Sequence, residues 1–245
     1  MKRFFSFFRT FGALHRSIHW WDLAVFLAAP VFGVTIRYFL PIVQKLIIFF
    51  PDLRPYQKAL DSLLMMISAF SLLYPFVLCG VEERMNGIAL SLTISPLRSS
   101  GYFICRYLMP CVYAAIYAFL MELCFSPVER PLLHTVLCCL LAAPVALTGM
   151  LAAPVLTNDK LDGIILLKFT VVIFLAIPSL LGHLLPLFLQ PVFLLCPAYW
   201  LMRFVAKQDW LMAVMSLATA LLWLGGSYSL WSRSLKQMRF VDSWE

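Results

Sequence analysis

The side chains that could do chemistry gather in a polar stretch between two long apolar segments. The stretch begins at Glu82 and Glu83 and closes at Pro96. Between Glu82 and Thr93 the apolar residues recur at intervals of three and four, which predicts a short amphipathic helix on a membrane surface. Gly87 is expected to let another backbone approach closely. Pro96 should end the element, because the residue before a proline is disfavoured in the helical conformation.

Ionisable side chains inside apolar segments are costly, so they mark candidate functional positions. Arg37, Glu122 and His183 are such residues. Arg37 and Glu122 lie toward the ends of their segments, where the simpler interpretation is that each side chain reaches the membrane interface and anchors its helix. The alternative is that one of them faces a water-filled cavity and contacts a substrate.

The residue patterns that several enzyme classes require are missing. No GxSxG sequence surrounds a serine, and the aspartates fall at helix ends or in loops. No acidic cluster beyond Glu82 and Glu83 could hold magnesium. The chain lacks GxxxxGK[ST], the loop with which many ATPases bind ATP. We therefore expect no enzyme activity and no cofactor.

The seven cysteines also argue against a metal centre. They mostly lie in apolar segments and include no CxxC pair, so we expect them to pack as small hydrophobic side chains. The histidines show no HExxH or similar spacing. No metal site is predicted.

Composition then identifies the class of protein that must position these residues. The chain has 245 residues, of which 62% are hydrophobic and 13% charged, with a mean hydropathy of +0.89. Such a chain is an integral membrane protein. A membrane-spanning helix needs roughly 20 apolar residues. An all-α domain covering 1–245 is predicted, with six spans near 23–43, 60–80, 102–124, 132–156, 163–186 and 210–231.

The segment 184–209 is apolar but interrupted by three prolines. Proline removes a backbone donor and breaks helices, so we interpret the segment as short re-entrant helices on the outer side. A seventh span is the competing interpretation.

Basic residues predict the orientation. With six spans, twelve of the nineteen Lys and Arg residues fall on one side. Because cytoplasmic loops carry the excess of basic residues, both termini and the polar stretch are placed in the cytoplasm. Residues 1–20 alternate aromatic and basic positions at helical spacing, which predicts an amphipathic helix lying in the lipid headgroup layer.

The polar stretch resembles the loop between the second and third spans in permease subunits of the type 2 ABC transporter family. That loop reads as glutamates, a glycine, a Pro-Leu pair, an aromatic residue and a basic residue. The resemblance implies that 82–100 is a coupling loop that docks on a separate ATPase subunit. The matching positions here are Glu82, Glu83, Gly87, Pro96, Leu97, Tyr102 and Arg106.

The family resemblance also implies a function. The short length and the proline-rich segment before the last span look most like small bacterial drug-export permeases, including those named for fluoroquinolone export. Such a subunit would sit in the bacterial plasma membrane, pair with a second copy or a paralogue, and use ATP hydrolysed by its partner. No nucleic-acid partner is expected. An ion-coupled secondary transporter and a membrane assembly protein without transport activity are the alternatives.

Overall fold

A computed structural model describes residues 24–39, 41–42, 57–88, 98–157, 159–178 and 193–241 of the chain. Regular structure in these residues is helical throughout, which confirms the predicted all-α fold. The reason is physical: lipid offers no hydrogen-bond partners, and a helix satisfies its backbone groups internally. The helix predicted for residues 1–20 lies outside the described residues.

Among the described residues, four helices are long and apolar enough to cross a membrane. A shorter apolar helix, Val25–Phe39, coincides with the first predicted span. The start of the fifth predicted span is helical in α11 (Lys160–Thr170) and in the π-helix η5 (Val171–Ala176). Six spans therefore remain a prediction, of which four have helices of full length: Gln57–Met85, Ser100–Phe125, Leu132–Leu156 and Trp210–Arg233.

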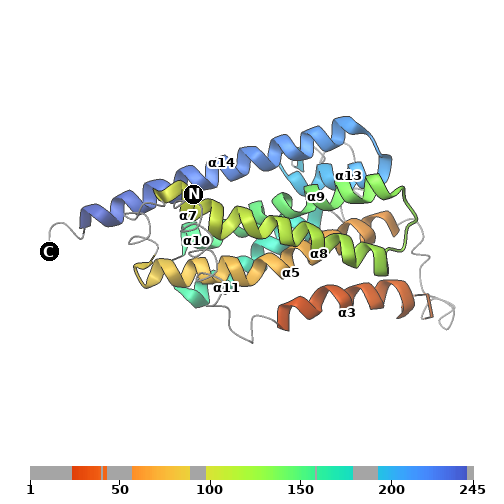
Figure 1. Cartoon of the computed structure of the whole chain (residues 1–245), viewed down its shortest axis with the longest axis horizontal. Coiled ribbons are helices and arrows are strands. Elements are labelled where there is room, and N and C mark those ends of the chain that lie inside the picture. Colours follow the sequence, from red (N-terminus) through yellow and green to blue (C-terminus); the bar gives the residue numbers. More distant parts are fainter. Residues whose placement is uncertain are drawn as a thin grey trace, which may run out of the picture.

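The helices lie side by side along one long axis (Figure 1). The helix α5 (Gln57–Met85) is the most enclosed of the four long helices, and the helix Leu132–Leu156, which includes α9 (Leu132–Met150), follows. The outer helices are Ser100–Phe125, which includes α8 (Met109–Phe125), and α14 (Trp210–Val241), and they are much less buried. Apolar side chains on the outer helices therefore face outward, as expected for contact with lipid.

The bundle has two ends, which we name after the arginine that each contains. The Arg106 end holds α7 (Arg98–Phe103) and the π-helix η4 (Ile104–Leu108), at the left of Figure 1. The Arg130 end holds the connection from α8 to α9, at the right of that view. The helices α5, α9 and α14 run toward the Arg106 end and α8 runs away from it, so α8 is antiparallel to α5 and α9.

Small residues let the helices approach one another. Ala114 and Ala118 on α8 and Ala142 and Ala146 on α9 are fully buried. In membranes, where lipid tails are as apolar as leucine, close packing of small side chains is a main source of helix association.

The described part of 184–209 contains one short helix, α13 (Pro197–Lys207). Its 11 residues span about 16 Å, which is less than the roughly 30 Å of a bilayer core. Gln208 adopts a left-handed conformation with φ 57° and turns the chain into α14. Residues 184–192, which decide between re-entrant helices and a seventh span, lie outside the described residues.

Gly80 offers a direct test of how tightly α5 packs. A Cβ at Gly80 would collide with the Tyr107 hydroxyl. We expect Gly80→Ala to lower the free energy of unfolding by about 1–3 kcal/mol, although alanine normally favours a helix interior. Chemical denaturation of the purified protein in detergent measures this.

Two further variants make the result interpretable. Adding Tyr107→Phe removes the colliding oxygen and should recover most of the lost stability. Gly225→Ala on α14, where the added Cβ has no neighbour within 4 Å, should be neutral or stabilising. Equal losses in Gly80→Ala and Gly225→Ala would contradict the packing argument.

Candidate functional site

At the Arg106 end, a buried ion pair joins the last turn of α5 to η4. The Arg106 Nη2 lies 2.7 Å from the Glu83 Oε1, and the Tyr102 hydroxyl donates a 2.6 Å hydrogen bond to the Glu83 Oε2. Glu83 is 6% exposed and Arg106 is fully buried. Both carboxylate oxygens therefore have partners, as a buried charge requires.

Aromatic packing connects this ion pair to α14. The Tyr102 ring stacks on Trp231 with centroids 5.4 Å apart and planes 6° apart. Phe103 packs against Tyr107 and Trp231. Since Tyr102 contacts both Glu83 and Trp231, the end of α5 and the second half of α14 share one buried cluster.

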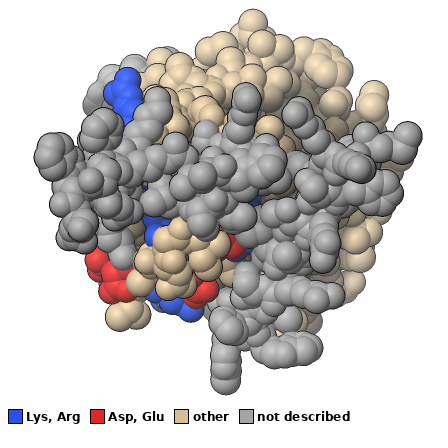
Figure 2. Space-filling view, turned by 60° about the vertical axis from the view of Figure 1, so that its left-hand side comes forward, with Lys and Arg blue, Asp and Glu red and all other residues tan. Residues whose placement is uncertain are grey.

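Two more charged residues tie the end of α5 to the segments that follow α9. The Arg84 Nη1 donates hydrogen bonds to the carbonyl oxygens of Pro154 (2.6 Å) and Val155 (2.8 Å) in α10 (Ala152–Leu156). Glu82 forms an ion pair with Lys160, the first residue of α11. Figure 2 brings this end forward and shows acidic and basic side chains next to one another in the lower part of the face.

A tight turn closes α5 and is exposed. We call residues 85–88 the α5 turn; all four are exposed. Gly87 has φ +68°, and its N–H donates to the Arg84 carbonyl oxygen at 3.2 Å. Glycine is the residue that most readily adopts this left-handed conformation after a helix, so Gly87 ends α5 here.

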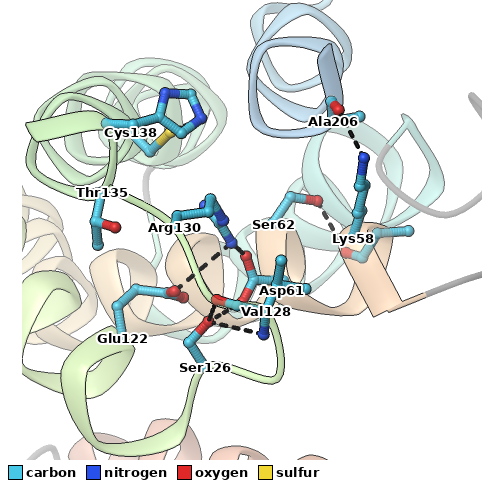
Figure 3. Close-up of polar contacts among 12 residues, drawn as sticks. Lys58, Asp61, Ser62, Glu122, Ser126, Val128, Arg130, Thr135, Cys138 and Ala206 are labelled. Atoms are coloured by element: carbon cyan, nitrogen blue, oxygen red, sulfur yellow. Dashed lines mark hydrogen bonds and ion pairs between the residues drawn. The ribbon is translucent and has the colours of Figure 1, made fainter. Parts of the chain in front are cut away.

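At the Arg130 end, a second buried cluster joins α5 to the connection between α8 and α9 (Figure 3). Asp61, in the second turn of α5, pairs with Arg130. The Ser126 hydroxyl donates a 2.7 Å hydrogen bond to the other Asp61 oxygen. Burial lowers the pKa of Arg130, because desolvation disfavours the charged form. Its ordinary value is so high that the guanidinium still keeps its proton.

A third charged residue, Glu122 of α8, lies beside this pair. Its Oε2 is 3.9 Å from the Arg130 Nη2, and the residue is 2% exposed. Lys58 points away from this pair, as Figure 3 shows: its ammonium donates a 2.9 Å hydrogen bond to the Ala206 carbonyl oxygen of α13. The cluster thus holds two carboxyl groups and one guanidinium.

Comparison with known families identifies the chain. A family model described as "Fluoroquinolones export permease protein Rv2686c-like" matches residues 22–228. The chain belongs to the Rv2686c-like family. The match covers the Glu83–Arg106 pair and the Asp61–Arg130 pair and ends within α14, and a permease family fits a membrane transport protein. No curated protein and no solved structure matched the chain in the same comparisons.

The structure distributes the predicted coupling residues of this permease over different environments. Glu82 lies on the rim, where it pairs with Lys160, whereas Glu83 points inward to Arg106. Gly87 is exposed, and a Cβ added to it would meet no atom within 4 Å. Pro96 lies outside the described residues. The predicted surface helix beginning at Glu82 is wrong in its start, because Glu82 and Glu83 belong to the last turns of α5.

The two candidate membrane residues also differ from each other. Arg37 is exposed, donates a 2.6 Å hydrogen bond to the Cys124 carbonyl oxygen and lies over the Tyr38 ring; its role as an interfacial anchor stays a prediction. Glu122 is buried inside the bundle instead of reaching the interface. His183, the third candidate, lies outside the described residues.

Asp61, Arg106 and Arg130 are the buried charges whose pairing the sequence did not reveal. Asp61 precedes the apolar core of its helix, so sequence alone suggests an ordinary polar residue at a helix end. The signal that could have found it is the presence of Asp61, Glu122 and Arg130 near the ends of three consecutive apolar segments. Antiparallel helices joined in this order bring those ends together.

Proposed function

We propose that this permease is the membrane subunit of an ATP-driven exporter and that the α5 turn is the docking surface for a separate ATPase subunit. The observation that carries this proposal is the position of the exposed turn directly after the buried pair Glu83–Arg106. A partner that contacts the turn would act on a helix end that is rigidly joined to the rest of the bundle.

The turn has the composition of a small docking surface. Met85 and Ile88 are 46% and 42% exposed, and the Glu82–Lys160 ion pair lies beside them. Apolar side chains at the polar end of the bundle have no lipid tails to cover them, so a protein partner would bury them favourably. The surrounding charges would orient that partner.

Movement of the docked turn would reach three parts of the bundle. Glu83 joins the turn to η4 through Arg106, and Tyr102 extends the connection to Trp231 of α14. Arg84 joins it to α10. When a helix end is joined to several neighbours, a small shift of that end can switch the whole bundle from one packed arrangement to another. In the exporter, ATP binding would drive the exchange between inward-open and outward-open states.

The remaining parts of the proposal concern location and cargo. We place the Arg106 end and both termini in the cytoplasm of a bacterium, on the basis of the excess of basic residues. A second permease copy or a paralogue would complete the transport path. The printed family name makes fluoroquinolones the first compounds to test as cargo.

A specific observation supports an ion-coupled transporter as the second candidate. Glu122 is a buried carboxyl group inside a transmembrane segment, and such residues often bind the coupling ion in secondary transporters. Membrane vesicles separate the two functions. Fluoroquinolone transport that requires ATP and survives collapse of ion gradients supports the exporter, whereas the reverse dependence supports the second candidate.

The docking surface is tested with a P-loop ATPase subunit, to be sought among the products of the neighbouring genes. Met85→Arg and Ile88→Arg should each weaken co-purification of the two subunits and lower permease-stimulated ATP hydrolysis by about tenfold or more, as loss of a buried contact residue does. Leu132→Arg is the matched control, because Leu132 is 65% exposed at the opposite end. Equal behaviour of all three variants would remove the α5 turn from the interface.

A further inference from the structure

The Arg130 end contains more negative than positive groups in its buried cluster. Asp61 and Glu122 are 0% and 2% exposed, and Arg130 is the cation that contacts both within the described residues. If both carboxyl groups were ionised, the cluster would carry one uncompensated negative charge. Burying such a charge is expensive unless a counter-charge neutralises it.

The contacts show which carboxyl group lacks compensation. Asp61 pairs directly with Arg130 and accepts the hydrogen bond from Ser126. Glu122 reaches Arg130 only at 3.9 Å. Ser126 also lies near Glu122, but its single hydroxyl proton is donated to Asp61, so within the described chain neither side-chain oxygen of Glu122 accepts a hydrogen bond. Asp61 is therefore the ionised partner of Arg130, and Glu122 is the group whose charge would stay unbalanced.

Other charged or titratable groups near Glu122 do not supply the missing charge. Arg37 of the first helix donates to the Cys124 carbonyl oxygen and is exposed. Lys58 of α5 donates to Ala206, and Glu129 of the connection is a further acid and is exposed. From α9, the cluster meets the side chains of His134, Cys138 and Cys139, of which His134 contacts the Cys138 sulfur at 3.6 Å.

We propose that Glu122 is a proton-binding site of this permease. Its carboxyl group carries a proton while the Arg130 end is closed around it. When that end opens, water solvates the carboxylate and the O–H bond of the acid breaks, so that one proton passes to water and Glu122 becomes ionised. Closure takes up one proton in return.

This inference stands apart from the docking proposal. It depends on three residues at the Arg130 end and would hold whether the energy for transport comes from ATP or from an ion gradient. The experiment therefore uses the purified full-length permease without any ATPase subunit.

Infrared spectroscopy of the protein in detergent reports the proton directly. A protonated carboxyl group has a C=O stretching band that is separate from the bands of carboxylates, and the chain has only 12 Asp and Glu residues. A carboxyl group in water has a pKa of about 4 and is therefore ionised near neutral pH. The wild type should show one protonated carboxyl band, which Glu122→Gln should lose and Glu129→Gln, at an exposed acid outside the cluster, should keep.

Each other result overturns the proposal. If the wild type shows no such band near neutral pH, the proposal is wrong. This part of the test needs no variant, so it stays valid even if Glu122→Gln fails to fold. Persistence of the band in Glu122→Gln places the proton elsewhere. Loss of the band in Asp61→Asn, with retention in Glu122→Gln, would assign the proton to Asp61.

Thermal unfolding gives an independent readout. If both acids had only a structural role, Glu122→Gln and Asp61→Asn would change the unfolding temperature alike. Glutamine resembles a protonated glutamate, so Glu122→Gln should leave the unfolding temperature near the wild-type value. Asp61→Asn removes the charged partner of Arg130 and should lower that temperature by roughly 5 °C or more. Equal losses in the two variants would mean that both side chains are ionised in the folded protein, against the proposal.

Discussion

Glu83→Ala is expected to lower the free energy of unfolding by about 3–5 kcal/mol, because it leaves the buried guanidinium of Arg106 without its carboxylate partner. Arg106 is fully buried, and the hydrogen bond from the Tyr102 hydroxyl is lost in the same variant. Chemical denaturation in detergent, followed by tryptophan fluorescence, measures the change, since Trp231 stacks on Tyr102. Export activity should fall together with stability.

The control for this prediction removes both charges at once. A double variant, Glu83→Leu with Arg106→Leu, leaves no buried ion and should be clearly more stable than Glu83→Ala. A double variant that is as unstable as the sum of both single variants would show that the two residues act independently. That outcome would argue against the ion pair as the connection between α5 and η4.

The second large effect is expected at the opposite end of the bundle. Arg130→Leu leaves the buried carboxylate of Asp61 without its cation and should cost about 3–5 kcal/mol of unfolding free energy. Asp61 and Arg130 join α5 to the connection between α8 and α9, so the loss should also loosen this end. Cysteine-reactive dyes can detect this, because buried Cys138 and Cys139 lie on α9 beside the cluster.

Adding Asp61→Asn to Arg130→Leu should restore a large part of the lost stability, because the remaining Glu122 can be accommodated as a neutral acid. The dye reactivity of Cys138 and Cys139 should return toward the wild-type rate in the double variant. Reactivity that stays high despite recovered stability would show that Arg130 shields the thiols by its volume and not by its charge.

Hydropathy was sufficient to locate the helices of the described chain. The predicted spans 60–80, 102–124, 132–156 and 210–231 each fall on a helix of spanning length. Their ends were less well predicted. The apolar run of the second span stops near residue 80, yet α5 continues to Met85. The helix can continue because Glu83 forms an ion pair with Arg106 inside the bundle, and it ends only where Gly87 adopts its left-handed conformation.

The environments of individual ionisable residues were the least predictable part. Arg37 and Glu122 look alike in the sequence, as single charges near the ends of apolar segments. In the structure Arg37 is exposed and Glu122 is buried. The difference depends on the direction in which each side chain points around its helix and on the helix that covers it, and neither is encoded in local hydropathy.

Composition and the pattern of apolar segments are enough to establish an all-helical membrane protein with a polar stretch after its second long segment, because lipid imposes helices and chain length limits their number. Pairing of charges is a different matter. Glu83 with Arg106 and Asp61 with Arg130 are 23 and 69 residues apart along the chain, and only the packing of antiparallel helices brings them together. That packing makes Glu83 an internal connection, leaves the α5 turn as the exposed surface, and encloses Glu122 beside an arginine already held by Asp61.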